Sequence, residues 1–150
     1  MAQSLSMVII HIIFSTKDRV PMIGEALRPR LHAFLAELAR ARGGNAYRVG
    51  GTADHVHIVT TLPRTITQSK LVEDVKRESS KWVKEQGPEH RGFYWQRGYG
   101  VFSLSRSHLA AAVEYVEGQE EHHRQKTFQD EFRAFLKRYG VEYDERYVWE

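Results

Sequence analysis

The order in which strand-like and helix-like segments follow one another constrains this fold more than any other feature of the sequence. Apolar, β-branched runs predict strands at residues 7–15, 46–49, 55–62 and 99–105. Apolar residues at helical spacing predict helices at residues 25–42, 67–86, 107–124 and 127–139. The order β-α-β-β-α-β is that of the ferredoxin-like split βαβ arrangement. We therefore expect an α+β fold in which two helices cover one face of an antiparallel sheet, the other face stays free for a site, and extra helices follow.

Residues that start or stop helices support these boundaries. Gly43 and Gly44 end the first helix, Thr67 is placed to cap the second, and Gly140 ends the last. The 150 residues contain no repeat, linker or low-complexity segment, so residues 1–150 are expected to form one domain.

The absence of cysteine narrows the chemistry. It excludes a disulfide scaffold, a thiolate zinc site and a cysteine nucleophile, and it fits a protein of the reducing cytoplasm. The apolar run "MVIIHIIF" has no basic segment before it and is too short to cross a bilayer. We interpret it as a buried strand and expect no membrane association.

Two histidines in the third expected strand are the first candidates for a site. His55 and His57 point to the same face of that strand, with Cα atoms about 7 Å apart. Such a pair can share a metal ion, or it can decorate a wet sheet face. Asp54 can orient one of the histidines or cap the turn, and His11 on the first strand is expected to be packed rather than functional.

A tyrosine and a glutamine form the second candidate pair. Tyr115 and Gln119 are four residues apart on an expected helix and so share one face of it. Taken alone, the pair equally fits a half-buried helix tyrosine and a solvated glutamine. His122 and His123, which follow, are expected to belong to a solvated helix end.

The positive charge is concentrated in one part of the chain. The net charge is +3, which permits a polyanionic partner without requiring one. Basic residues lie close to the aromatic residues of "FYW" and "GYG", a mixture that suits phosphate contacts and base stacking. The candidates for DNA binding are Lys70, Lys76, Arg77, Lys81, Arg97 and Arg106. The alternative is a solvated helix face followed by an aromatic core strand.

Together these motifs resemble one family over nearly the whole chain. "DHVHIV" resembles the histidine–hydrophobic–histidine motif of the single-tyrosine HUH transposases, which include the two-hundred-type insertion-sequence enzymes and their relatives associated with repetitive extragenic palindromes. "FYWQRGYGVFSLS" resembles the family's Trp-Gln-x-Gly-Tyr-Gly segment. "EYVEGQEEHH" is similar to its tyrosine helix, and "FQDEFRAFLKRYGVEYDERYVWE" to its C-terminal tail.

The resemblance implies a mechanism and a set of partners. His55, His57 and Gln119 would bind one divalent cation, Mg²⁺ or Mn²⁺, of which nitrogen ligands favour Mn²⁺. Tyr115 would attack a phosphate of single-stranded DNA and form a 5′-phosphotyrosine, which a 3′-hydroxyl could later displace. The expected substrate is single-stranded DNA with hairpin ends, and the expected assembly is a homodimer. Gly118 departs from the asparagine that is common in the family, and we expect it to loosen the helix that holds Tyr115.

Two other functions remain open at the level of sequence. A ferredoxin-like domain could bind hairpin nucleic acid without cutting it, or the histidines could activate water in a hydrolytic nuclease. A covalent protein–DNA adduct would distinguish the transposase from both alternatives.

Overall fold

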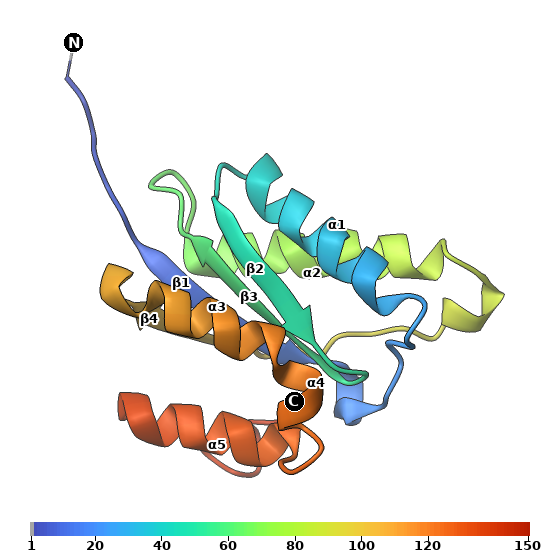
Figure 1. Ribbon diagram of the computed structural model, residues 1–150. Coiled ribbons are helices and arrows are strands. Elements are labelled where there is room, and N and C mark those ends of the chain that lie inside the picture. Colours follow the sequence, from blue (N-terminus) through green and yellow to red (C-terminus); the bar gives the residue numbers. More distant parts are fainter. Residues whose placement is uncertain (1) are drawn as a thin grey trace.

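The computed structural model describes residues 2–150 as one antiparallel sheet with helices on both of its faces (Figure 1). The strands are β1 (Ile9–Ser15), β2 (Ala46–Gly51), β3 (His55–Thr61) and β4 (Gly100–Leu104). The helices are α1 (Arg28–Ala41), α2 (Gln68–Lys84), α3 (Leu109–Glu117), α4 (Gln119–His122) and α5 (Phe128–Tyr139). Short 3₁₀ turns occur at Lys17–Arg19, Pro88–His90 and Arg106–His108.

The strand order confirms the expected α+β architecture. The order across the sheet is β2-β3-β1-β4, and every neighbouring pair is antiparallel. Strand β1 therefore lies between β3 and β4. Its residue His11 is opposite Val59 of β3 on one side and Phe102 of β4 on the other. This arrangement is the split βαβ pattern that the sequence predicts.

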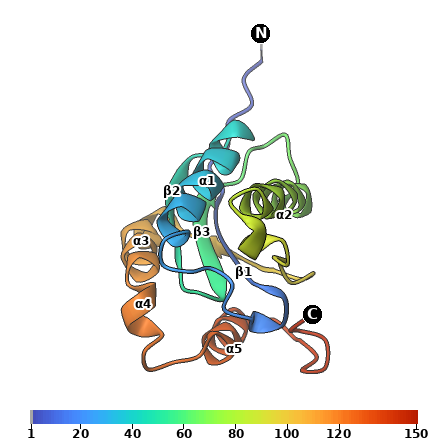
Figure 2. The same cartoon turned by 90° about the vertical axis from the view of Figure 1, so that its right-hand side faces the viewer.

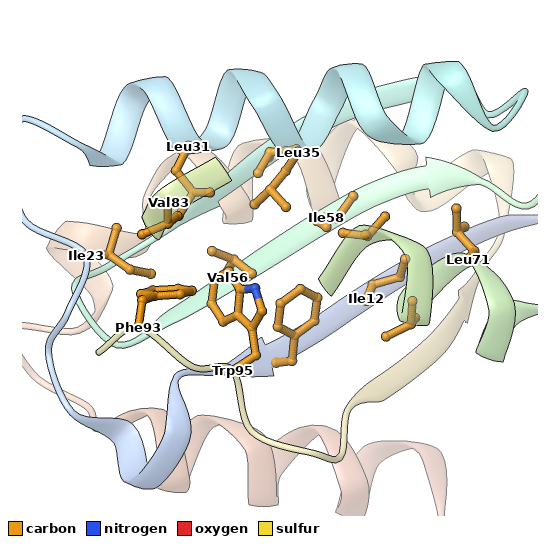
Figure 3. Close-up of a cluster of buried hydrophobic side chains, with 14 of the residues drawn as sticks. Ile12, Ile23, Leu31, Leu35, Val56, Ile58, Leu71, Val83, Phe93 and Trp95 are labelled. Carbon is orange, nitrogen blue, oxygen red and sulfur yellow. The ribbon is translucent and has the colours of Figure 1, made fainter. Parts of the chain in front are cut away.

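One face of the sheet carries the main apolar core. Ile12 of β1 and Val56 and Ile58 of β3 point towards α1 and α2, where they meet Leu31 and Leu35 (Figure 3). All five side chains are almost fully buried. The period of two along each strand is what separates these residues from the histidines between them.

The opposite face is covered, which corrects the expectation that it would be free. Helix α3 lies against β2 and β3, and α5 packs its phenylalanines against β1 and β4 (Figure 2). Two glycines allow this close approach, because a Cβ atom at Gly50 would lie 2.4 Å from the Val116 carbonyl oxygen, and one at Gly100 would lie 2.7 Å from the Phe132 ring. The site therefore forms between the sheet and the C-terminal helices.

The helix ends agree with the sequence at most positions. The Thr67 and Thr127 hydroxyls accept backbone hydrogen bonds at the starts of α2 and α5, and Gly140 ends α5 with a φ of 66°. The exception is the expected helix over 107–124, which is interrupted at Gly118 (φ −88°, ψ 13°) between α3 and α4. Tyr115 and Gln119 are thus on separate helices, so the prediction of one continuous helix is wrong, but both side chains still point the same way and reach Glu131 Oε2.

The two ends of the chain lie apart from each other in different environments. Residues 2–8 extend away from the body of the molecule (Figure 1). The last residues pack back on it, since Gly98 donates its backbone N–H to the Glu150 carbonyl at 2.8 Å and Trp149 contacts Phe132 of α5. Within residues 2–150 no helix has the length and apolar character that a membrane crossing requires.

Candidate active site

Strand β3 places His55 and His57 side by side on the face that α3, α4 and α5 cover. Both side chains are completely buried, and their ring centroids are 5.1 Å apart. The strand period predicts their common face, but the burial excludes the alternative of a wet, decorative pair.

Each histidine is held at its Nδ1 atom by a neighbouring side chain. His55 Nδ1 lies 2.7 Å from Asp54 Oδ1, and His57 Nδ1 lies 2.7 Å from His11 Nε2. Such supporting contacts fix the ring orientation of metal-binding histidines. Asp54 is therefore placed to orient His55, which is one of the two roles expected for it. His11 is packed, as expected, and it also supports His57.

The Nε2 atoms of the pair converge with oxygen atoms from the C-terminal helices. His55 Nε2 is 2.9 Å from Gln119 Oε1, and His57 Nε2 is 2.9 Å from Glu131 Oε1. The contact with the Asp54 carboxylate favours a proton on Nδ1 of His55. The Nε2 atom of His55 then has no proton, and its lone pair faces a lone pair of Gln119 Oε1. Two lone pairs that face each other repel, whereas a cation bound between them would be coordinated by both atoms.

His123 adds another nitrogen to this cluster. Its Nε2 atom is buried and has no hydrogen-bond partner, although it lies only 3.2 Å from Glu131 Oε2. The sequence-based expectation of a solvated helix end is wrong for His123, whose side chain is 9% exposed, because the turn after α4 folds back over β3. His122 is more exposed, at 35%.

The donor set fits a divalent cation. The ligand atoms of His55, His57, His123 and Glu131 all lie within 4.8 Å of one another. Imidazole nitrogens combined with a carboxylate oxygen suit a first-row transition metal or Zn²⁺ better than an all-oxygen site would. The cluster can therefore hold a metal ion, whose identity the geometry leaves open.

The protonation states also suit metal binding. Burial lowers the pKa of His57 to about 4 and that of His11 to about 3. Burial opposes ionisation of Glu131, but its contacts with His123 and His57 outweigh this effect and hold its pKa well below its usual range. At neutral pH the His57 imidazole is therefore neutral and the Glu131 carboxylate is charged, which are the forms that bind metal.

Tyr115 reaches the same carboxylate from α3. Its hydroxyl donates to Glu131 Oε2 and lies 3.3 Å from His122 Nε2, and its ring centroid is 6.0 Å from that of His57. Burial and the Glu131 charge both raise the pKa of Tyr115. Within one chain, a tyrosine hydroxyl therefore lies beside the histidine cluster and is protonated at neutral pH.

A groove of about 800 Å³ is lined by Tyr115 and, at its buried wall, by Glu131. It runs between the end of β4, α3 and α5, and its walls include Lys126 and Arg138. Lys126 and Arg138 bring positive charge into the groove that Tyr115 lines.

Four of the six basic residues that the sequence suggested for DNA binding lie elsewhere. Helix α2, with Lys70, Lys76, Arg77 and Lys81, covers the sheet face opposite the histidines (Figure 2). Lys76 Nζ donates to the carbonyls of Gln96 and Arg97 at 2.8 and 3.1 Å. Lys70 and Arg77 both pair with Asp74, at 3.2 and 3.0 Å, yet they are exposed, as are Lys81, Arg97 and Arg106. A DNA contact for these residues stays a prediction.

Sequence reasoning missed Glu131, the residue on which the cluster converges. A signal was present, because Glu131 lies three residues after Phe128 and four before Phe135, both on the buried face of α5. A charged residue on an apolar helix face needs a partner, and its position marks it as a candidate for a site.

Comparisons with known proteins identify a family and similar folds. Residues 4–119 match the family described as "Transposase IS200 like". The chain is similar to a candidate transposase from Deinococcus radiodurans R1, with a TM-score of 0.62 and 20% identity, over 79% of this chain and 95% of that one. It is also similar to a REP-associated tyrosine transposase bound to a REP hairpin, with a TM-score of 0.59 and 13% identity, over 82% of this chain and 74% of that one. Comparison with curated proteins gave no match.

Proposed function

The chain belongs to the IS200-like transposase family, and from this premise we propose that it cleaves and rejoins single-stranded DNA through a covalent phosphotyrosine on Tyr115. The observation that carries the proposal is that the Tyr115 hydroxyl donates to Glu131, the carboxylate that also contacts the buried pair His55 and His57, and that Tyr115 lines a groove. His55, His57 and Gln119 are the proposed ligands of a divalent cation, Mg²⁺ or Mn²⁺.

The chemistry follows from the placement of these groups. A bound divalent cation would polarise the scissile phosphate and offset the charge of Glu131. Tyr115 Oη would form a bond to phosphorus while the bond from phosphorus to the 3′-oxygen breaks, and the hydroxyl proton would pass to the departing oxygen by way of neighbouring groups. The reverse attack by a 3′-hydroxyl restores the tyrosine and joins the strands, so no water is consumed.

The proposed substrate is single-stranded DNA that carries a hairpin. The similar REP-associated transposase is bound to a REP hairpin, and this chain has a groove beside Tyr115 with Lys126 and Arg138 in its walls. We propose that the groove takes the single strand near the cleaved phosphate. The six basic residues named from the sequence remain candidates for contacts with the hairpin phosphates: Lys70, Lys76, Arg77, Lys81, Arg97 and Arg106.

Replacement of the tyrosine tests the proposal. Tyr115→Phe removes one oxygen and should abolish strand cleavage and the covalent adduct, by more than about 10³-fold, while hairpin binding persists. A labelled hairpin oligonucleotide is incubated with Mn²⁺ or Mg²⁺ and run on a denaturing gel. Tyr147→Phe is the matched control, because Tyr147 is 59% exposed in the C-terminal tail.

The same gel distinguishes the alternative functions. Wild-type protein should give a band that stays shifted in denaturant. Cleavage without such a band would favour the hydrolytic nuclease, and binding without cleavage in either metal would favour a non-catalytic hairpin-binding module. An adduct that persists in Tyr115→Phe would move the nucleophile to another tyrosine.

A homodimer remains part of the proposal. The family resemblance implies it, although Tyr115 already meets the histidines of its own chain. Sedimentation at micromolar concentration should give twice the mass of the 17.4 kDa chain, and a monomer would contradict this part.

A further inference from the structure

We propose that Glu131 is a bridging carboxylate, with Oε1 as a ligand of the cation and Oε2 as the acceptor that holds the Tyr115 hydroxyl. One side chain would then fix the nucleophile relative to the ion. The inference rests on the proposed function, because it assigns Glu131 a place in that site.

The two carboxylate oxygens face different groups. Oε1 lies 2.9 Å from His57 Nε2 and 3.6 Å from His55 Nε2, on the side where both histidines present their ring nitrogens. Oε2 accepts hydrogen bonds from Gln119 Nε2, at 2.9 Å, and from the Tyr115 hydroxyl. A cation bound between the histidines can therefore use Oε1 without displacing the tyrosine from Oε2.

The charge of Glu131 also calls for a cation. The side chain is 2% exposed, and an ionised carboxylate at such a depth is costly unless it is paired. Within residues 2–150, the basic side chains within 4.0 Å of it are all histidines. A divalent ion bound among these side chains would place a positive charge directly beside the carboxylate.

The position of Glu131 in the chain makes the C-terminal helix part of the site. Glu131 lies beyond the matched residues 4–119. Its helix is fixed by Phe132 and Phe135 against the sheet, and Arg133 pairs with Glu145 of the tail at 2.7 Å. Binding of the cation should therefore also fasten α5 to the sheet.

Manganese binding tests the role of Glu131 without reliance on activity. Titration of the metal-free protein with Mn²⁺, followed by calorimetry or by the electron paramagnetic resonance of free Mn²⁺, should show at least a tenfold loss of affinity in Glu131→Gln. Glu121→Gln is the matched control, because the Glu121 side chain is 72% exposed and pairs only with Arg124. The control should bind Mn²⁺ as the wild type does.

The position of the nucleophile is tested at saturating Mn²⁺. With the ion restored, Glu131→Gln should still form the DNA adduct with a lower kcat and a nearly unchanged KM, because Tyr115 has lost its anionic acceptor. Equal Mn²⁺ affinity in Glu131→Gln and wild type would overturn the proposal, even if the wild-type adduct on Tyr115 confirms the proposed function.

A structure of the wild-type protein with Mn²⁺ decides the question if Glu131→Gln does not fold. The anomalous peak should lie within about 2.0–2.3 Å of Glu131 Oε1 and of the two histidine Nε2 atoms. A peak at the histidines with Glu131 out of bonding distance would overturn the proposal. A peak at Glu131 in a protein that never forms a DNA adduct would instead leave this inference standing and refute the proposed function.

Discussion

The two faces of the sheet are built from alternate residues of the same strands, yet they bury different chemistry. In β3, Val56 and Ile58 face an apolar core under α1 and α2, whereas His55 and His57 face nitrogen and oxygen atoms under α4 and α5. The apolar face gains stability from every side chain that it buries. The polar face buries a carboxylate and histidines, which is favourable only when each is paired.

The difference indicates how the molecule divides its tasks. The α1 and α2 layer holds the strands in register, and the C-terminal helices bring Gln119, His123 and Glu131 to the histidines at fixed distances. Because neighbouring residues of one strand serve the two tasks, single substitutions in β3 can separate them.

Replacement on the polar face should have the largest effect on activity. His57→Ala removes a proposed metal ligand and should reduce cleavage by more than the roughly 10- to 100-fold that loss of a supporting contact costs. Hairpin binding should persist, because it depends on phosphate contacts outside the cluster. Cleavage assays with Mg²⁺ and Mn²⁺ check this, and a near wild-type rate in either metal would contradict the site.

Replacement of Ile58, the next residue, on the apolar face, should have the opposite pattern: a loss of stability with little loss of activity. Ile58→Ala removes a fully buried side chain and should lower the free energy of unfolding by about 2–5 kcal/mol. The rate of adduct formation well below the melting temperature should change little. Urea denaturation and the gel assay measure the two quantities, and a loss of activity without a loss of stability would show that the faces are coupled.

Acid should destabilise the metal-free protein through the polar face. Because the folded pKa values of His57 and His11, about 4 and 3, lie below the unfolded value near 6.5, the unfolded state binds protons first as the pH falls. Stability should decrease from about pH 6.5 towards pH 4, by up to about 1.4 kcal/mol per pH unit for each histidine.

The low pKa of Glu131 acts in the same direction. Its contribution is present above its unfolded pKa and is lost as the pH falls below that value. Urea midpoints measured from pH 7.5 to pH 4.5 check the effect of the histidines, and a continuation to about pH 3 checks that of Glu131. A midpoint that stays constant down to pH 5 would mean that the buried histidines are already charged in the folded protein.

Loss of a supporting contact should have the smallest effect. Asp54→Asn keeps the size of the side chain that contacts His55 Nδ1 but removes its charge. The Mn²⁺ affinity should fall about 10- to 100-fold. Calorimetric titration measures it, with Asp130→Asn as the control because the Asp130 side chain is 60% exposed. Equal affinities in the two variants would show that Asp54 only stabilises its turn.

Most of the fold could be predicted from the sequence because its signals are local. The alternation in β1 and β3 and the capping residues Thr67 and Thr127 locate the elements to within a few residues. The break at Gly118 was less predictable, since a glycine weakens a helix without always ending it. The sequence analysis did not predict that helices α3 and α5 cover the second face of the sheet. These helices come close to the sheet at Gly50 and Gly100, and only the packed structure shows such contacts.

The candidate site was predictable only in part, because some of its residues are distant from one another in the sequence. His55 and His57 are two residues apart on one strand, so the strand period alone places them together. Glu131 meets His57 across 74 residues of sequence, and no local pattern specifies such a contact. His123 lies in a short turn after α4, where its burial depends on how α5 folds back.

Identification of the residue that becomes joined to DNA tests the central claim most directly. Wild-type protein is incubated with Mn²⁺ and a hairpin oligonucleotide, denatured and digested, and the nucleotide-bearing peptide is sequenced by mass spectrometry. The account predicts that the added mass lies on Tyr115 through a phosphodiester to the 5′ end of the cleaved strand. A modified Tyr143 or Tyr147, or cleaved DNA with a free 5′-phosphate and no modified peptide, would contradict it.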